Sequence, residues 1–156
     1  MKEGKKLSLR QMIIIGVFTG LGSVGGKIGY NYFTSGSISE PTSIQKTLVR
    51  IANETNKILP MLLDQYTRLD TTIAGGENRF IYLYTLLEVD ISSLNKDEFT
   101  SQMKPNLINW YKTLADMDVF RKMDVEITYT YRSEKWVEFT SITIFPKDFS
   151  EKMQAG

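Results

Sequence analysis

The chain has 156 residues, a formal net charge of +1 at pH 7, and neither cysteine nor histidine. The missing cysteines exclude disulfides, thiolate nucleophiles and Cys-ligated zinc, and the missing histidines remove the commonest general base and metal ligand. Residues 1–39 carry five basic side chains and one acidic one, whereas residues 40–156 have a net charge of −3. The downstream part therefore has no electrostatic footprint for nucleic acid, and we expect no nucleic-acid partner.

A long apolar stretch follows the basic N-terminus. Lys27 is the only charged residue in 11–33, and these 23 residues are enough to cross a lipid bilayer. By the positive-inside rule the basic flank keeps the N-terminus in the cytoplasm, so the chain is predicted to be anchored in the inner membrane. The predicted parts are a cytoplasmic N-terminus (1–10), a transmembrane helix (11–33), a linker (34–39), an extracytoplasmic domain (40–148) and a tail (149–156).

Glycines recur along the predicted transmembrane helix at a spacing of four residues. Small residues at this spacing let two helices approach closely in lipid. We therefore predict a packing face for another membrane protein or for a second copy of this chain, in addition to the lipid bilayer itself. The residues of this face are Gly16, Gly20, Gly22, Gly25, Gly26 and Gly29.

The same stretch has two alternative interpretations. Residues 20–25 match G-x-G-x-x-G, but a dinucleotide-binding turn needs a following amphipathic helix and further βαβ units, and the sequence has neither. A cleaved signal peptide also fits, because a basic start and an apolar core precede the small residues Ser23 and Gly25. In that case the domain is released as a secreted or periplasmic binding or inhibitor module.

The first half of the predicted domain contains one helix and two strands. Apolar residues from Ile44 to Ile58 recur at helical spacing, with Pro41 at the start and Pro60 beyond the end. Residues 63–73 and 79–88 are predicted strands joined by a glycine-containing loop. The second of them is apolar on both faces, which is typical of a central strand.

The second half repeats this order. Asn95 is a predicted N-cap for a helix to about residue 117, in which Pro105 should cause a kink or a restart. Two strands follow, over 125–131 and 136–144. The predicted fold class is therefore α+β: one N-terminal transmembrane helix and a compact αββαββ domain, whose four-stranded antiparallel sheet carries its helices on one face.

The densest polar cluster of the domain is Asp64, Arg68 and Asp70. These residues share parity on a strand, so they are expected to project from one face. Two carboxylates could serve as acid and base, but carboxylates beside an arginine are more often a solvated ion pair, which we favour. The aspartates between 116 and 124 lack calcium-loop spacing. We therefore expect no enzyme, no catalytic residue, no metal and no cofactor.

One further pattern covers residues 59–86. It consists of Leu59-Pro60, Asp64, Thr67-Arg68-Leu69-Asp70, Asn78-Arg79-Phe80, Tyr82 and Tyr84-Thr85-Leu86. The pattern resembles one in small, uncharacterised bacterial proteins that join an N-terminal hydrophobic segment to one exported domain. The resemblance implies an exported, non-enzymatic protein. We therefore expect a single-pass membrane-anchored accessory or interaction protein, a non-catalytic subunit of a membrane complex, with the released module as the alternative.

Overall fold

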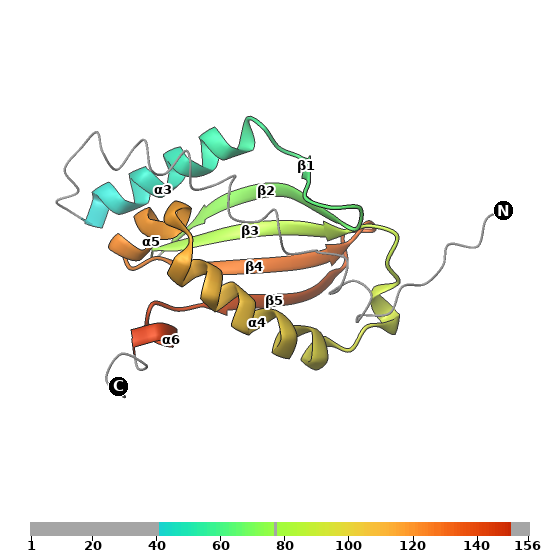
Figure 1. The fold of residues 1–156 in the computed structure, drawn as a ribbon. Coiled ribbons are helices and arrows are strands. Elements are labelled where there is room, and N and C mark those ends of the chain that lie inside the picture. The colour runs from blue at the N-terminus through green and yellow to red at the C-terminus, as the bar shows by residue number, and fades with distance from the viewer. Residues whose placement is uncertain (1–40, 77, 151–156) are drawn as a thin grey trace.

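The computed structural model describes residues 41–76 and 78–150, which form a five-stranded sheet with helices on one face (Figure 1). The strands lie in the order β1-β2-β3-β4-β5. In chain order the elements are α3 (Pro41–Asn56), β1 (Met61–Leu62), β2 (Thr67–Gly75), β3 (Arg79–Leu86), η1 (Ile91–Ser93), α4 (Lys96–Thr113), η2 (Ala115–Met117), α5 (Asp118–Lys122), β4 (Glu126–Ser133), β5 (Glu138–Ile144) and α6 (Lys147–Ser150).

The sheet is mixed, so the predicted four-stranded antiparallel sheet is wrong. β3 and β4 run parallel, with Arg79 opposite Glu126 and Leu86 opposite Ser133, while the other neighbours are antiparallel. A parallel pair needs a crossover that returns the chain to the starting end of the sheet. Helix α4 has 18 residues and a length of about 27 Å, which suits this return.

The additional strand is β1, which lies just before the predicted strand over residues 63–73. The chain turns between the two strands because the Tyr66 backbone N–H donates to Asp64 Oδ1 at 2.7 Å. Met61 and Leu62 then lie opposite Leu69 and Arg68. A strand of two residues is too short to show an alternating pattern, which explains why it was not predicted.

Local sequence signals account for helix α4. The side chain of Asn95 accepts hydrogen bonds from the backbone N–H groups of Asp97 and Glu98, as expected of an N-cap. The helix continues through Pro105 without interruption, so it does not restart there. Its inner face buries four large side chains against the sheet, namely Phe99, Met103, Leu107 and Tyr111.

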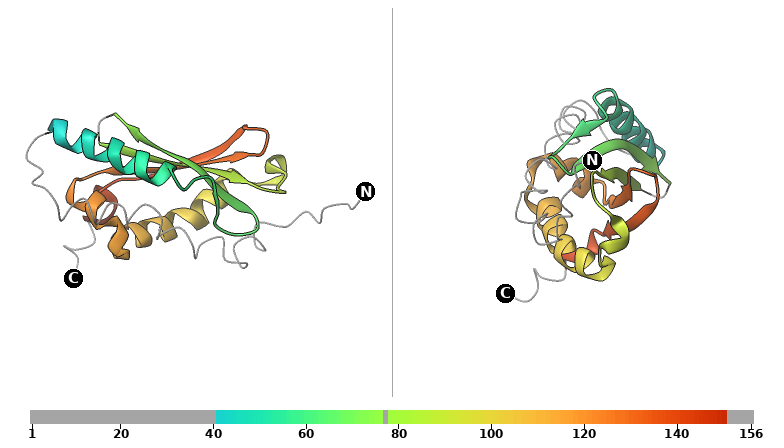
Figure 2. Two further views of the ribbon diagram at one scale, coloured as in Figure 1. Left: turned by 90° about the horizontal axis from the view of Figure 1, so that it is seen from above. Right: turned by 90° about the vertical axis from the view of Figure 1, so that its right-hand side faces the viewer.

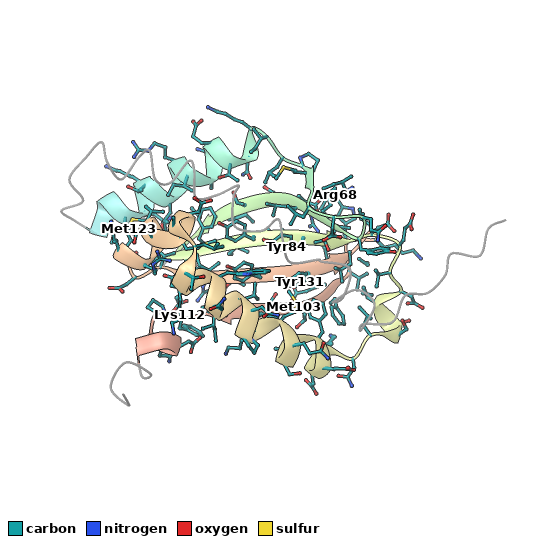
Figure 3. All side chains as sticks on the ribbon, in the orientation of Figure 1. Arg68, Tyr84, Met103, Lys112, Met123 and Tyr131 are labelled. Carbon is teal, nitrogen blue, oxygen red and sulfur yellow. The ribbon has the colours of Figure 1, made fainter. Side chains whose placement is uncertain are left out.

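The covered face of the sheet carries four stacked tyrosines at its centre. Tyr82 stacks on Tyr129 across the parallel strands with ring centroids 5.5 Å apart, and Tyr84 stacks on Tyr131 at 5.2 Å. Phe99 of α4 meets the Tyr131 ring edge-on at 5.0 Å. Figure 3 shows the labelled Tyr84, Tyr131 and Met103 together in this layer, with α4 in front of the sheet. All four tyrosines are almost completely buried.

Helix α3 lies beside β2 and protects that side of the sheet, as the two views of Figure 2 show. The Thr72 backbone N–H donates to Asn56 Oδ1 at 2.7 Å, and Asn56 Nδ2 donates to the Thr72 carbonyl at 2.9 Å. The amide of Asn56 thus pairs with β2 as a neighbouring strand would. Leu48 and Ile51, on the inner face of α3, are fully buried.

The predicted transmembrane helix needs a correction. Among residues 41–76 and 78–150, no helix has both the length and the apolar character required to cross a bilayer. Residues 11–33, with the six glycines of the predicted packing face, lie outside the described residues. The described fold is an α+β domain whose two long helices are amphipathic, because each covers the sheet with one face and meets water with the other.

Candidate functional site

A bulge in β2 determines which side chains point away from the helices. The register against β3 shifts between Leu69 and Thr71, which makes Asp70 an extra residue in the strand. Leu69 is buried on the covered face before the bulge, and Thr72 takes this role after it. Arg68 and Ile73 therefore share the opposite face although they are an odd number of residues apart.

We call this opposite side of the sheet the open face, because no described helix covers it. Hydroxyl groups pair across its strands: Thr128 with Thr143 at 3.0 Å, and Thr130 with Ser141 at 2.9 Å. By strand register, the open face consists of Leu62, Arg68, Thr71, Ile73, Arg79, Ile81, Leu83, Thr85, Glu126, Thr128, Thr130, Arg132, Glu138, Ser141 and Thr143.

One end of the open face holds an ion-pair cluster around Asp70. Its Oδ1 accepts from Arg68 Nε at 2.5 Å, and its Oδ2 accepts from Arg132 Nη2 at 3.0 Å and from the Thr85 hydroxyl. The Asp70 side chain is only 9% exposed. Burial alone would raise the pKa of this carboxyl, but the hydrogen bonds from Thr85, Arg68 and Arg132 outweigh burial and lower the pKa.

The structure brings together only two of the three predicted site residues. Arg68 and Asp70 are in contact, whereas Asp64 lies in the turn before β2. Thr85 and Arg132 were not among the predicted site residues. Both come from strands whose alignment with β2 depends on the register of β3 and on the parallel pairing of β4, and no local pattern indicates either.

Exposed apolar side chains flank this cluster. The Trp136 ring lies over the Arg132 guanidinium at 3.8 Å and is 68% exposed, and Leu62 is exposed opposite Arg68. Trp136 also has a φ of 64°. A bulky residue in this left-handed region carries about 1–2 kcal/mol of conformational strain. The fold therefore holds the Trp136 ring in place with a strained backbone.

The chemistry of the open face suits recognition better than proton transfer. Every oxygen of the Asp70 carboxylate accepts a hydrogen bond, and its lowered pKa keeps it ionised at neutral pH. Within residues 41–76 and 78–150, no three acidic side chains gather in a group able to hold a metal ion. The cluster fixes the positions of two arginines beside exposed apolar groups, a combination typical of protein interfaces.

The described residues form a small α+β domain whose open face carries an ion-pair cluster beside exposed apolar side chains. Residues 43–139 match the model of a family described as a domain of unknown function, DUF8479, and the chain belongs to this family. Among proteins of curated function, none matches the sequence.

Solved structures share the fold at low sequence identity. A candidate secreted protein from Pseudomonas aeruginosa matches with a TM-score of 0.58 and 12% identity, over 72% of this chain and 97% of that protein. EpsS, a pilotin of the Vibrio vulnificus type 2 secretion system, matches with a TM-score of 0.54 and 8% identity, over 68% of this chain and 91% of that protein. AspS, the type II secretion system pilotin of Vibrio cholerae, matches with a TM-score of 0.52 and 8% identity, over 68% of this chain and 92% of that protein.

The predicted localisation in the inner membrane is wrong. The described part of the chain has no helix suited to span a membrane, and one protein of the same fold is described in terms of secretion. A basic start followed by an apolar core is common to membrane anchors and to cleaved signal peptides. The pattern in residues 1–33 therefore did not separate the two cases.

Proposed function

We propose that this protein is an exported, non-catalytic accessory protein that binds a protein partner through the open face. The observation that carries the proposal is the shared fold with two pilotins of type II secretion systems, which covers 91% and 92% of those chains. Both of these proteins are named as pilotins of a secretion system, and their fold supports an accessory role for this chain.

Export in this proposal proceeds by signal-peptide cleavage. The basic residues before Gln11, the apolar core that follows and the small residues Ser23 and Gly25 meet the requirements of such a signal. The mature chain would then begin close to residue 26. Intact-mass measurement of the protein recovered from the host should show the loss of about 25 residues, and a full-length mass would contradict this part of the proposal.

The side chains of the open face support its role as the partner surface. Interface hot spots are enriched in tryptophan and arginine, and groups that are already fixed before binding lose less entropy on binding. Trp136 is stacked on Arg132, and Asp70 in turn holds Arg132 in place. Ile73 adds an exposed apolar side chain on the same face, nearer the β2–β3 turn and away from Trp136. Trp136 and the two arginines are thus presented together at one end of the face, and Ile73 extends the apolar surface toward the other end.

Site-specific photo-crosslinking tests the open face directly. A benzophenone amino acid at Ile73, which is 45% exposed, is compared with the same group at Val49 on the outer face of α3, which is 41% exposed. We expect a discrete protein adduct in cells from position 73 and none from position 49. Equal labelling from both positions, or none from position 73, would refute the open face as the partner surface.

A substitution at Trp136 provides the second arm of this test. Glycine adopts a φ of 64° readily, so Trp136→Gly should leave the domain folded while it removes the exposed ring. The adduct from position 73 should then become several times weaker. If the adduct from a folded Trp136→Gly protein is unchanged, Trp136 does not contribute to partner binding.

A further inference from the structure

A second surface lies on the outer side of α4, away from the open face. A groove of about 420 Å³ runs between this helix and α6. Along α4 it is lined at intervals of one helical turn by Thr100, Lys104, Ile108 and Lys112, and Asp148 of α6 forms part of the wall. Figure 3 shows Lys112 at the end of α4 that lies nearest to α6.

The groove carries a net positive charge, from two lysines and one carboxylate. Neither Lys104 nor Lys112 forms an ion pair with a described residue, whereas Lys57 and Lys122 elsewhere on the domain do. The single carboxylate of the wall, Asp148, accepts the backbone N–H of Phe145 at 3.0 Å. Eight residues of helix separate the lysines, which places them about 12 Å apart.

The floor between the two lysines is apolar. Ile108 is partly buried against the core, and Pro105 lines the groove one turn from Ser101. Proline has no backbone N–H, so the Ser101 carbonyl lacks its usual donor within the helix. Along the groove, the cationic Lys104, the apolar Ile108 and the cationic Lys112 follow one another. The Ser101 carbonyl is a hydrogen-bond acceptor at one side.

We propose that this groove binds an amphipathic helical segment of a protein partner, with two carboxylates two turns apart and an apolar side chain between them. Charge complementarity supports this occupant: each carboxylate meets one lysine, and the apolar side chain covers Ile108. An anionic membrane surface fits less well, because recognition of such surfaces uses clusters of four to eight basic residues, and this groove has two beside an acidic wall.

A designed peptide tests this proposal on the mature protein. The probe is a labelled, alanine-based helical peptide with glutamates at its fourth and twelfth positions and leucine at its eighth. The control peptide has the same composition with both glutamates moved to the opposite helix face. We expect saturable binding of the probe in fluorescence anisotropy, much weaker binding of the control peptide, and loss of affinity as ionic strength rises.

Matched variants locate the binding site. Lys104→Gln with Lys112→Gln should weaken binding about fivefold to twentyfold, the effect of two surface ion pairs. Lys104→Arg with Lys112→Arg should retain binding, and so should Lys46→Gln with Lys135→Gln, which removes equal charge elsewhere. Trp136→Gly should also leave the peptide affinity unchanged, because this groove is separate from the open face.

Several results would overturn the proposal. These are no saturable binding by the wild-type protein, equal binding of the control peptide, or equal weakening by the two pairs of glutamine substitutions. Phosphatidylglycerol vesicles provide the remaining arm. If they bind in a manner that depends on Lys104 and Lys112 while the peptide does not bind, the groove recognises a lipid surface instead.

Discussion

At the scale of single residues, the buried tyrosines differ in how their hydroxyl groups are satisfied. The hydroxyls of Tyr82, Tyr129 and Tyr131 are buried and make no hydrogen bond with any described residue. The hydroxyl of Tyr111 instead donates to the Val125 carbonyl at 2.9 Å. A buried polar group without a partner costs free energy, whereas a paired one contributes to stability. Removal of the hydroxyl should therefore have opposite effects on stability at Tyr111 and at the three tyrosines whose hydroxyls are unpaired.

Tyr129→Phe should raise the free energy of unfolding by about 1 kcal/mol, because it removes an unsatisfied hydroxyl and leaves the ring stack intact. Tyr111→Phe serves as the matched control and should lower this free energy by about 1 kcal/mol through loss of its hydrogen bond. Urea denaturation of both variants checks the pair. A clear loss of stability in Tyr129→Phe would show that this hydroxyl has a partner.

Asp70 offers a second test at this scale. Asp70→Asn should lower the free energy of unfolding by about 2–3 kcal/mol, because it leaves Arg68 and Arg132 without their shared carboxylate in a largely buried position. Asp64→Asn is the control and should change stability little, because the new side chain keeps an oxygen that can accept from Tyr66. Equal effects of the two substitutions would contradict the assigned role of Asp70.

At the scale of elements, α3 stabilises the sheet through one asparagine as well as through its apolar face. Asn56 exchanges two hydrogen bonds with the backbone of Thr72, and the Thr72 hydroxyl lies 3.0 Å from Asn56 Oδ1. Beyond the two residues of β1, this side chain provides backbone pairing for the outer side of β2. Unpaired strand edges invite association with other strands, so we infer that Asn56 also protects the protein from self-association.

Asn56→Ala should lower the free energy of unfolding by about 2–3 kcal/mol, since it leaves a buried backbone donor and acceptor without partners. It should also increase the fraction of dimers and larger species in light scattering at high protein concentration. Asn53→Ala, an exposed substitution one turn earlier on α3, is the control and should do neither. If the Asn56→Ala protein remains as stable as wild type, the edge is held by other contacts.

At the scale of the whole molecule, the tyrosine core links stability to pH. Burial raises the pKa of Tyr82, Tyr84, Tyr129 and Tyr131 above the ordinary value near 10. The unfolded chain ionises these tyrosines near pH 10, while the folded chain keeps them protonated. Above pH 10 the unfolded state therefore binds fewer protons than the folded state, and stability must fall as the pH rises.

Up to about pH 9, these tyrosines should leave the free energy of unfolding unchanged. It should then fall by about 1.4 kcal/mol per pH unit for each buried tyrosine. Urea denaturation across this range measures the slope, which should be smaller in Tyr129→Phe with Tyr131→Phe. Tyrosinate absorbance from more than the other four of the eight tyrosines, before the loss of folded circular dichroism, would contradict the burial of these groups.

The residue patterns predicted the elements that depend on local periodicity. An apolar run in residues 79–88 and alternation in residues 125–131 indicated strands, and in the structure the tyrosines of both strands lie on one buried face. The N-cap at Asn95 and the apolar spacing after Pro41 likewise predicted α4 and α3. Period and capping act between residues close in sequence, so a single chain reveals them.

Only the tertiary structure decided the parallel pairing of β3 with β4, the bulge at Asp70 and the cluster that joins Asp70 to Thr85 and Arg132. These features depend on strand register and on the path of the crossover helix, which arise from contacts between residues far apart in sequence. The sequence by itself determined the two long helices and the four long strands, though not β1, and that the chain has no cysteine and no histidine. The fold then decided which of the remaining polar and apolar residues share a surface, because neighbours across a sheet are set by packing and not by spacing along the chain.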